Sequence, residues 1–126
     1  MIHEELCTYE VAKLAKEKGF DEYVEAFYAE DCNTAHTQGP EKWNEYKGKY
    51  AAPTQSLLQR WLRAEKNIHI EIIATASGYY WCINKTNGTS ITDSDVLNRG
   101  TNEGGCFDTY ELALENALKY ALENLV

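Results

Sequence analysis

The sequence predicts an α+β fold in which helices pack on one face of a small antiparallel three-stranded meander, in the approximate order α, irregular segment, α, β, β, β, α. The main observation is that apolar residues change from helical spacing to strict alternation between residues 53 and 72. Asn87-Gly88, a pair typical of two-residue hairpin turns, then joins two β-rich stretches. An amphipathic helical pattern follows over residues 107–126. Together these features are typical of helices layered on an antiparallel sheet.

A first helix is expected within residues 8–20. Thr8 is a residue type that caps helix N-termini, and Gly19 can adopt the left-handed conformation that ends a helix. Phe20 is expected to fold back on the helix that precedes it. The apolar stripe of this helix consists of Val11, Leu14 and Ala15.

Residues 21–50 show no clear periodicity. The stretch EYVEAFYAED is rich in aromatic residues and is compatible with either a strand or a helical turn. Residues 33–49 have loop composition, and Gly39-Pro40 is a strong breaker of regular structure. A loop of this length is uncommon in a compact domain, so the segment is expected to hold short unrecognised elements or to contribute to function.

A second helix begins near Pro53, which suits the first turn of a helix because the missing N–H has no partner there. Asn67 is expected to end this helix in the left-handed conformation. The core-facing residues of the helix are Leu57, Leu58, Trp61 and Leu62, and the alternating residues of the strand that follows are Ile68, Ile70 and Ile72. Two further strands are expected over residues 79–84 and 89–92.

Residues 93–105 have loop composition, and Gly104-Gly105 is interpreted as a turn because no nucleotide-binding motif surrounds it. The last helix is expected to start at Asp108, with Glu111 three residues later as in a capping box. Thr-Tyr-Glu occurs at the start of both terminal helices, which indicates one capping solution used twice. The apolar face of the last helix consists of Tyr110, Leu114, Ala117, Leu118, Ala121 and Leu125.

The composition predicts a single acidic domain over residues 1–126. Twenty acidic and twelve basic side chains give a formal net charge of −8, which repels phosphate backbones and anionic lipids and so disfavours nucleic-acid binding. No apolar run is long enough to span a membrane, and the acidic N-terminal residues differ from a secretory signal. We therefore expect a cytoplasmic protein with reduced cysteines.

Three blocks of the sequence resemble other proteins. EVAKLAKEKGF, APTQSLLQRWLR running into NIHIEI, and FDTYELALENALKYAL resemble a group of small uncharacterised proteins encoded by bacteriophages and prophages of gut bacteria. The block PTQSLLQRWLR is specific, whereas residues 28–50 and 93–105 match only as variable polar loops. The resemblance implies a phage or mobile-element origin and a free-standing cytoplasmic domain, and it implies no particular activity, cofactor or catalytic residue.

Residue types used in catalysis and metal binding are present without a recognisable motif. His3 with Cys7 and Cys32 with His36 supply the ligand types of a structural zinc site, but one pair lies at the start of the chain and the other in loop composition. Cys32 and His36 could also form a thiolate–imidazole pair, although no catalytic signature surrounds them. We therefore predict that the protein is not an enzyme and holds no metal or other cofactor.

The surplus of aromatic residues favours a binding function. Tyr79, Tyr80 and Trp81 are adjacent on one predicted strand, so rings lie on both faces of the sheet, and only one face can pack on the helices. The other face is covered either by residues 21–50 or by a partner. We predict a non-enzymatic module that binds a protein partner or a second copy of itself. The candidate partner-binding residues are Tyr79, Tyr80, Trp81 and Trp43.

The alternative function is related to nucleic acids. Arg60, Arg63 and Lys66 on the second helix could contact phosphates weakly, or the acidic chain could mimic DNA toward a host protein. We favour a structural interpretation of this helix, in which the leucines and Trp61 face the core and the arginines pair with nearby acids. Steep weakening of binding by salt distinguishes phosphate contacts from an aromatic interface.

Overall fold

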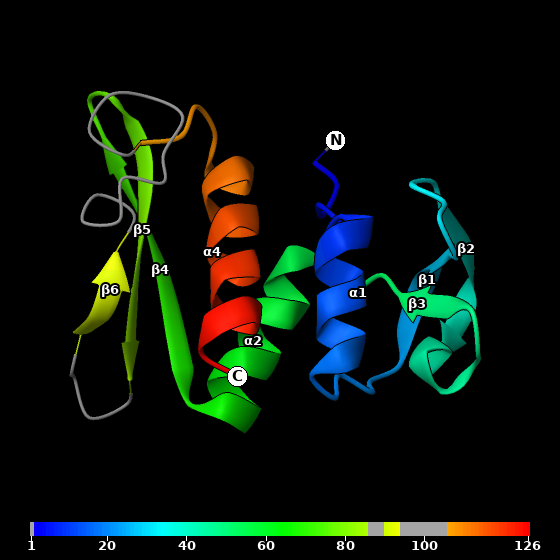
Figure 1. The fold of residues 1–126 in the computed structure, drawn as a ribbon. Coiled ribbons are helices and arrows are strands. Elements are labelled where there is room, and N and C mark those ends of the chain that lie inside the picture. Colours follow the sequence, from blue (N-terminus) through cyan, green and yellow to red (C-terminus); the bar gives the residue numbers. More distant parts are fainter. Residues whose placement is uncertain (1, 86–89, 94–105) are drawn as a thin grey trace.

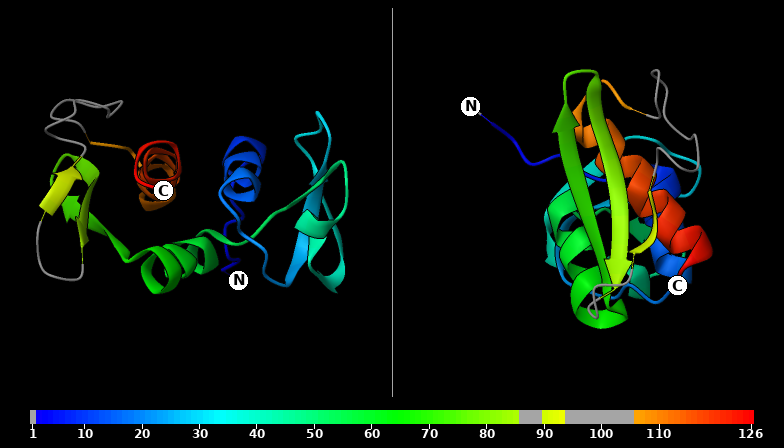
Figure 2. Two further views of the ribbon diagram at one scale, coloured as in Figure 1. Left: turned by 60° about the horizontal axis from the view of Figure 1, so that its bottom comes forward. Right: turned by 90° about the vertical axis from the view of Figure 1, so that its left-hand side faces the viewer.

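The computed structural model describes residues 2–85, 90–93 and 106–126, which fold into two small antiparallel sheets with a layer of α-helices between them (Figures 1 and 2). The described elements are, in order, α1 (Tyr9–Glu17), β1 (Val24–Ala29), β2 (Ala35–Glu41), the 3-10 helix η1 (Trp43–Glu45), β3 (Lys49–Ala51), α2 (Gln55–Lys66), β4 (Ile68–Thr75), β5 (Gly78–Lys85), β6 (Ser90–Asp93) and α4 (Tyr110–Asn124). The predicted α+β class is confirmed. The predicted arrangement, with helices on one face of a single meander, accounts for only one of the two sheets.

The sheet formed by β1, β2 and β3 was not predicted. Its strand order is β2-β1-β3, and both neighbours of β1 are antiparallel to it. The predicted order is therefore in error where it gives residues 21–50 as irregular, whereas the accompanying expectation that this segment holds short unrecognised elements is confirmed. Two features explain the error. β2 is a polar edge strand, where Gly39-Pro40 is tolerated, and β1 buries Ala26, Phe27 and Tyr28 in succession, so it lacks the alternation that identifies a strand.

β4, β5 and β6 form the predicted meander in that order, and both strand pairs are antiparallel. Ile72 lies opposite Trp81, and Ile70 lies opposite Ile83. These four side chains belong to the face that packs on the helices and join the core there. The predicted turn at Asn87-Gly88 lies outside the described residues.

Each of the three described α-helices begins with a threonine cap. Oγ1 of Thr8, Thr54 and Thr109 accepts a hydrogen bond from the backbone N–H three residues further on, at 3.3, 3.2 and 3.1 Å respectively. The prediction for Thr8 is confirmed. Pro53 and Asp108 each precede a cap instead of lying in or capping a helix, because the threonine that follows each of them is extended and supplies the capping oxygen.

The predicted ends of the first two helices are confirmed. Gly19 (φ 94°) and Asn67 (φ 61°) adopt the left-handed conformation that follows α1 and α2. The N–H of Phe20 bonds to the carbonyl of Ala15 at 2.9 Å, so the chain folds back on α1 as expected. The Phe20 ring is buried, and its centre lies 5.4 Å from that of Trp61.

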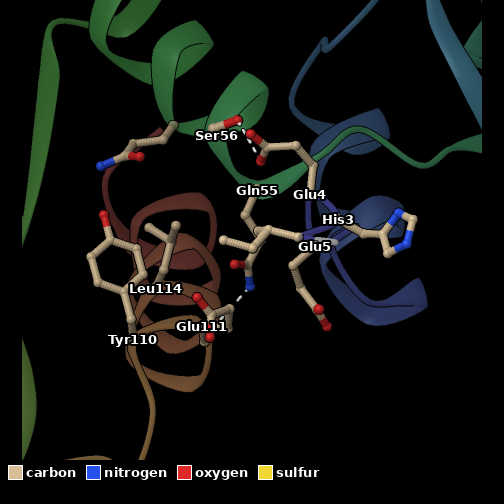
Figure 3. Close-up of a pocket in the computed structure, with 10 residues that line it drawn as sticks. His3, Glu4, Glu5, Gln55, Ser56, Tyr110, Glu111 and Leu114 are labelled. Carbon is tan, nitrogen blue, oxygen red and sulfur yellow. Dashed lines mark hydrogen bonds between the residues drawn. The ribbon is translucent and has the colours of Figure 1, made fainter.

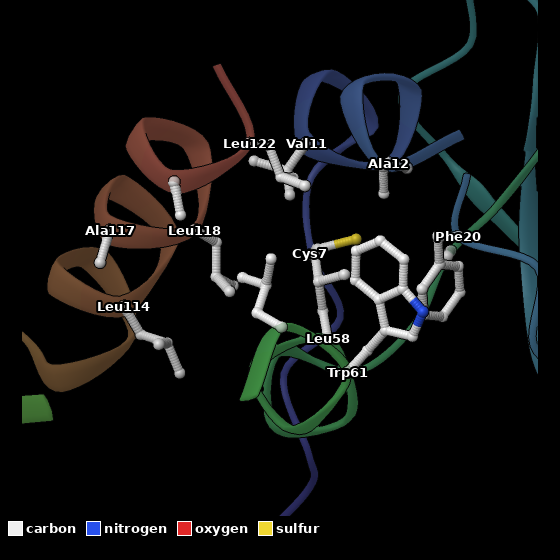
Figure 4. Packing of buried hydrophobic residues seen from close by; sticks show 14 of the residues in the cluster. Cys7, Val11, Ala12, Phe20, Leu58, Trp61, Leu114, Ala117, Leu118 and Leu122 are labelled. Atoms are coloured by element: carbon white, nitrogen blue, oxygen red, sulfur yellow. The ribbon is translucent and has the colours of Figure 1, made fainter. Parts of the chain in front are cut away.

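The buried side chains form one cluster that includes residues of the helical layer and of both sheets. Leu58 of α2 and Leu118 of α4 are fully buried where these two helices face each other, and Leu122 of α4 is fully buried beside Val11 of α1 (Figure 4). Full burial of one such leucine stabilises a fold by about 1.5–3 kcal/mol. Apolar packing between the helices therefore stabilises the described part of the chain, together with buried strand residues such as Trp81, Ile68 and Ile83.

A polar junction joins the beginnings of the three described helices. Oε2 of Glu115 on α4 accepts hydrogen bonds from the N–H of Thr8 at 2.9 Å and from its hydroxyl at 2.7 Å. The buried Gln55 at the start of α2 donates from Nε2 to Oε1 of Glu115 at 2.8 Å and to the carbonyl of Glu111 at 3.0 Å. Carboxylates at helix N-termini also interact favourably with the helix dipole. The junction thus positions the helices relative to one another at one end of the layer.

Alkaline pH is expected to destabilise the fold through Tyr28 and Cys7. The hydroxyl of Tyr28 donates to the carbonyl of Cys7 at 2.6 Å. Burial raises the pKa of Tyr28 from 10.0 to about 12, and burial raises the pKa of the Cys7 thiol above its usual 9.0. The folded chain therefore keeps protons that the unfolded chain releases, so the stability from these groups is complete below about pH 9 and falls as the pH rises toward about 12.

Urea unfolding at a series of pH values measures this effect. We expect the free energy of unfolding to decline above about pH 9, with a slope to which Cys7 and Tyr28 together contribute up to about two protons. Tyr28→Phe should remove only the additional steepening that begins near about pH 10, while the share of the decline due to Cys7 remains. A free energy of unfolding that stays constant to about pH 11 would contradict the burial of these two groups.

Candidate partner-binding surface

The adjacent rings of β5 point to opposite sides of the sheet, which confirms the predicted alternation. Trp81 faces the helices, is fully buried, and donates from Nε1 to Oδ1 of Asn116 on α4 at 2.9 Å. Tyr79 lies on the same side, with its ring centre 6.2 Å from that of Tyr110. Tyr80 points away from the helices and is half-buried. Trp81 is thus a core residue, and Tyr80 is the ring of the three whose direction suits contact with a partner.

Trp43 lies in a different part of the molecule from the β5 rings. It belongs to η1 beside the other sheet, is 7% exposed, and donates from Nε1 to the carbonyl of Val24 at 2.9 Å. Residues 21–50 form that sheet on the far side of the helices, so they do not cover the outer face of β4-β5-β6 (Figure 2). The four candidate residues therefore do not form one surface.

The basic residues of α2 lie on its exposed side. Arg60, Arg63 and Lys66 are all exposed, while the leucine and tryptophan side chains on the opposite side of the helix are buried. This burial confirms the structural role predicted for the helix, except that Leu57, which was predicted to face the core, is only partly buried. The predicted pairing of the arginines with acids is not observed, because the ion pair found within the described residues joins Lys119 to Glu10 at 2.8 Å.

Two adjacent hollows border α2. The larger, about 300 Å³ in volume, is lined by Glu22, Leu57, Arg60, Trp61, Ala64 and Glu65. The smaller, about 170 Å³, lies between α2 and β1, and its apolar lining includes Leu6, Tyr23, Val24, Ala26, Ala52 and Leu57. Leu57 borders both hollows, so they form one continuous surface, which we call the α2 surface.

Tyr23 lies at the rim of the α2 surface. It is 64% exposed, and Nζ of Lys42 lies 5.4 Å from the centre of its ring. Tyrosine and tryptophan are among the residue types that most often dominate binding energy at protein interfaces. This surface could not be predicted from the sequence, because Tyr23 and Leu57 belong to separate segments. No signal in the sequence separated Leu57 from the core-facing residues of the helix, because consecutive helix residues can both be buried, as Trp61 and Leu62 are.

Carboxylates gather at the end of the helical layer where the described helices begin. Glu4, Glu5 and Glu111 line a hollow of about 320 Å³ there (Figure 3). The hairpin between β1 and β2 adds two acids, because the N–H of Asp31 bonds to the hydroxyl of Tyr9 in the first turn of α1 at 3.1 Å. We call this group the acidic end, and its members are Glu4, Glu5, Glu10, Glu30, Asp31, Glu111 and Glu115.

The residues considered for metal binding or nucleophilic chemistry lie in unrelated surroundings. Cys7 is fully buried, and burial raises the pKa of its thiol, which disfavours the thiolate that a metal or a nucleophilic reaction needs. Cys32 is half-buried with its thiol directed to the carbonyl of Thr34, and the His36 ring packs on Phe27 with ring centres 5.4 Å apart. No group of three or more metal-ligating side chains occurs among the residues described. Gly104-Gly105 lies outside them.

The chain matches no known protein family, no curated protein and no solved structure. None of the helices in the described ranges is long and apolar enough to cross a membrane. The function is therefore argued from the geometry of the α2 surface and of the acidic end.

Proposed function

We propose that the chain is a non-enzymatic protein-binding module that holds its partner at the α2 surface. The observation that supports this most strongly is the continuity of two hollows at Leu57, with Tyr23 exposed at their rim. An apolar centre with aromatic side chains and a polar rim is the composition of many protein interfaces. The resemblance to phage and prophage proteins supports a role as an accessory factor of a mobile element in the cytoplasm.

The charges around the α2 surface favour a basic partner. Glu22 and Glu65 line the larger hollow, and Glu25 lines the smaller. A partner segment that inserts one apolar side chain and places basic residues against these carboxylates complements both features. The net charge of −8 also accelerates association with a basic protein at low salt.

Affinity capture tests the proposal. The immobilised chain is mixed with lysate of the host cell, with and without nuclease treatment. The molecules retained by wild type, Tyr23→Ala and the double variant Arg63→Glu/Lys66→Glu, whose two residues line neither hollow, are compared. We expect Tyr23→Ala to lose the specific partner, because this exposed ring contributes to binding and little to stability. The double variant should retain it, because added carboxylates do not repel a basic partner. The opposite pattern, with binding that falls steeply as salt rises, would favour phosphate contacts by α2.

Mimicry of DNA toward a DNA-binding protein is a second candidate function, and the acidic end is the observation that favours it. Carboxylates from the N-terminal segment, α1, the β1–β2 hairpin and α4 gather there, as phosphates gather along a DNA backbone. In this case duplex DNA should release the captured protein, and Glu4→Gln/Glu5→Gln should weaken capture while Tyr23→Ala leaves it unchanged. Retention of the captured protein in excess DNA would exclude mimicry.

A further inference from the structure

A lysine ammonium on the outer face of the β2-β1-β3 sheet is surrounded by three aromatic rings. Nζ of Lys49 lies 4.8 Å from the centre of the Phe27 ring, 5.1 Å from that of Trp43 and 5.2 Å from that of Tyr46. All three distances are within the range in which the negative face of a ring attracts a cation. We call the three rings the aromatic cage. Its members come from β1, η1 and the residue that follows η1.

The rings of the aromatic cage are held by contacts that do not involve the Lys49 side chain. Nε1 of Trp43 donates to a backbone carbonyl of β1 at 2.9 Å, and the Trp43 ring centre lies 4.5 Å from that of Phe27 and 5.8 Å from that of Tyr46. Nζ of Lys16 on α1 donates to the carbonyl of Tyr46 at 3.0 Å and to the carbonyl of Lys49 at 2.8 Å. Hydrogen bonds to backbone carbonyls and contacts between the rings therefore hold the cage in place without the Lys49 side chain.

The Lys49 ammonium, which occupies the cage, is the group that a ligand can replace. No carboxylate within the described residues forms an ion pair with Lys49, so the ring faces are the main partners found for its ammonium. A lysine side chain loses conformational entropy when it is fixed, which offsets part of the attraction. An ammonium that carries methyl groups is less strongly hydrated and also buries apolar surface against the rings, so it is the better ligand for such a cage.

The charge around the cage suits a cation as well. The carboxylate of Glu41, followed by smaller contributions that include Glu45, raises the pKa of the Tyr46 phenol, which places negative charge beside this wall of the cage. Tyr46 is itself 44% exposed, so the cage opens to solvent at this ring.

We propose that Phe27, Trp43 and Tyr46 form a binding site for methylated ammonium groups, and that Lys49 fills this site in the free chain. The ligand is either a small quaternary amine or a methylated lysine side chain of a protein, since both present the same group. The site lies on a different sheet face from the α2 surface and does not depend on the function proposed for that surface.

Titration with tetramethylammonium chloride, followed through the indole N–H resonance of Trp43 in NMR spectra, tests the proposal. Lys49→Ala removes the internal competitor, so it should bind tetramethylammonium about tenfold more tightly than wild type. Lys49→Met is the second variant if Lys49→Ala does not fold. Adding Tyr46→Ala to either variant removes an exposed wall and should weaken binding about tenfold. Ammonium chloride at equal concentration controls for ionic strength.

The same titration with a trimethyllysine peptide and its unmodified counterpart distinguishes the two sources of the ligand. Tighter binding of the methylated peptide than of tetramethylammonium indicates a protein ligand, and equal binding indicates a small amine. The proposal is overturned if folded Lys49→Ala or Lys49→Met shows no saturable shift with tetramethylammonium, or if the shift is the same with ammonium or without the Tyr46 ring.

Discussion

Replacement of Trp81 by alanine is expected to lower the free energy of unfolding by about 3–5 kcal/mol. The ring is fully buried between β5 and α4, and its centre lies 5.3 Å from that of Tyr120. Truncation leaves a cavity that the surrounding helices and strands fill only in part. It also removes the indole N–H that donates a hydrogen bond to Asn116 Oδ1 at 2.9 Å. The loss of this partner adds the desolvation cost of the Asn116 oxygen.

Urea unfolding of Trp81→Ala measures this loss of stability. Tyr80→Ser, a change at the neighbouring residue of the same strand, is the control. Tyr80 is half-buried and points away from the helices, so its truncation should cost clearly less, on the order of 1 kcal/mol. Trp81→Phe keeps most of the ring volume and isolates the hydrogen bond to Asn116, for which we expect a loss of about 1–3 kcal/mol. Equal losses for Trp81→Ala and Tyr80→Ser would mean that the two faces of the sheet are equally buried.

Trp61→Ala is expected to cost about 3–5 kcal/mol as well, whereas Arg63→Ala should change the free energy of unfolding by less than about 0.5 kcal/mol. Trp61 is 8% exposed and meets the Phe20 ring edge to face, with ring centres 5.4 Å apart, so it ties α2 to the segment that follows α1. Arg63 is exposed on the same helix and serves as the matched control.

The same urea experiment decides between two roles for Trp61, which also lines the larger hollow of the α2 surface. A large loss of stability means that the ring is mainly a core residue and that the exposed rim residues contribute the binding energy. A neutral Trp61→Ala would contradict this and would assign the ring to partner binding.

The helices and the β4-β5-β6 meander could be predicted because their local patterns agree with their environment. α2 has a buried stripe at helical spacing, and β4 alternates Ile68, Ile70 and Ile72 on one face, so periodicity alone identifies both. The β2-β1-β3 sheet could not be predicted in this way. β2 is polar and mostly exposed, and the central strand β1 buries Ala26, Phe27 and Tyr28 in succession, which removes the alternation.

The candidate sites were less predictable than the fold, because they depend on contacts between segments. Alternation along β5 correctly predicts that Tyr80 points to the opposite face of the sheet from Tyr79 and Trp81. Nothing in the sequence, however, predicts that Tyr23 lies beside Leu57 of α2. The aromatic cage is closer in sequence, but Phe27 meets Trp43 only because β1 lies at the centre of a sheet that the sequence did not predict.

The most direct test of partner binding at the α2 surface is calorimetric titration of the captured partner, prepared without methylated lysines, against two tyrosine variants. Tyr23 and Tyr46 are both exposed, at 64% and 44%, and each has a lysine ammonium over its ring, but only Tyr23 borders the α2 surface. Tyr23→Ala should raise the dissociation constant at least about 30-fold, the effect of losing a hot-spot residue, while Tyr46→Ala stays within about threefold of wild type. An unchanged dissociation constant for Tyr23→Ala, or an equal rise for both variants, would contradict binding at the α2 surface.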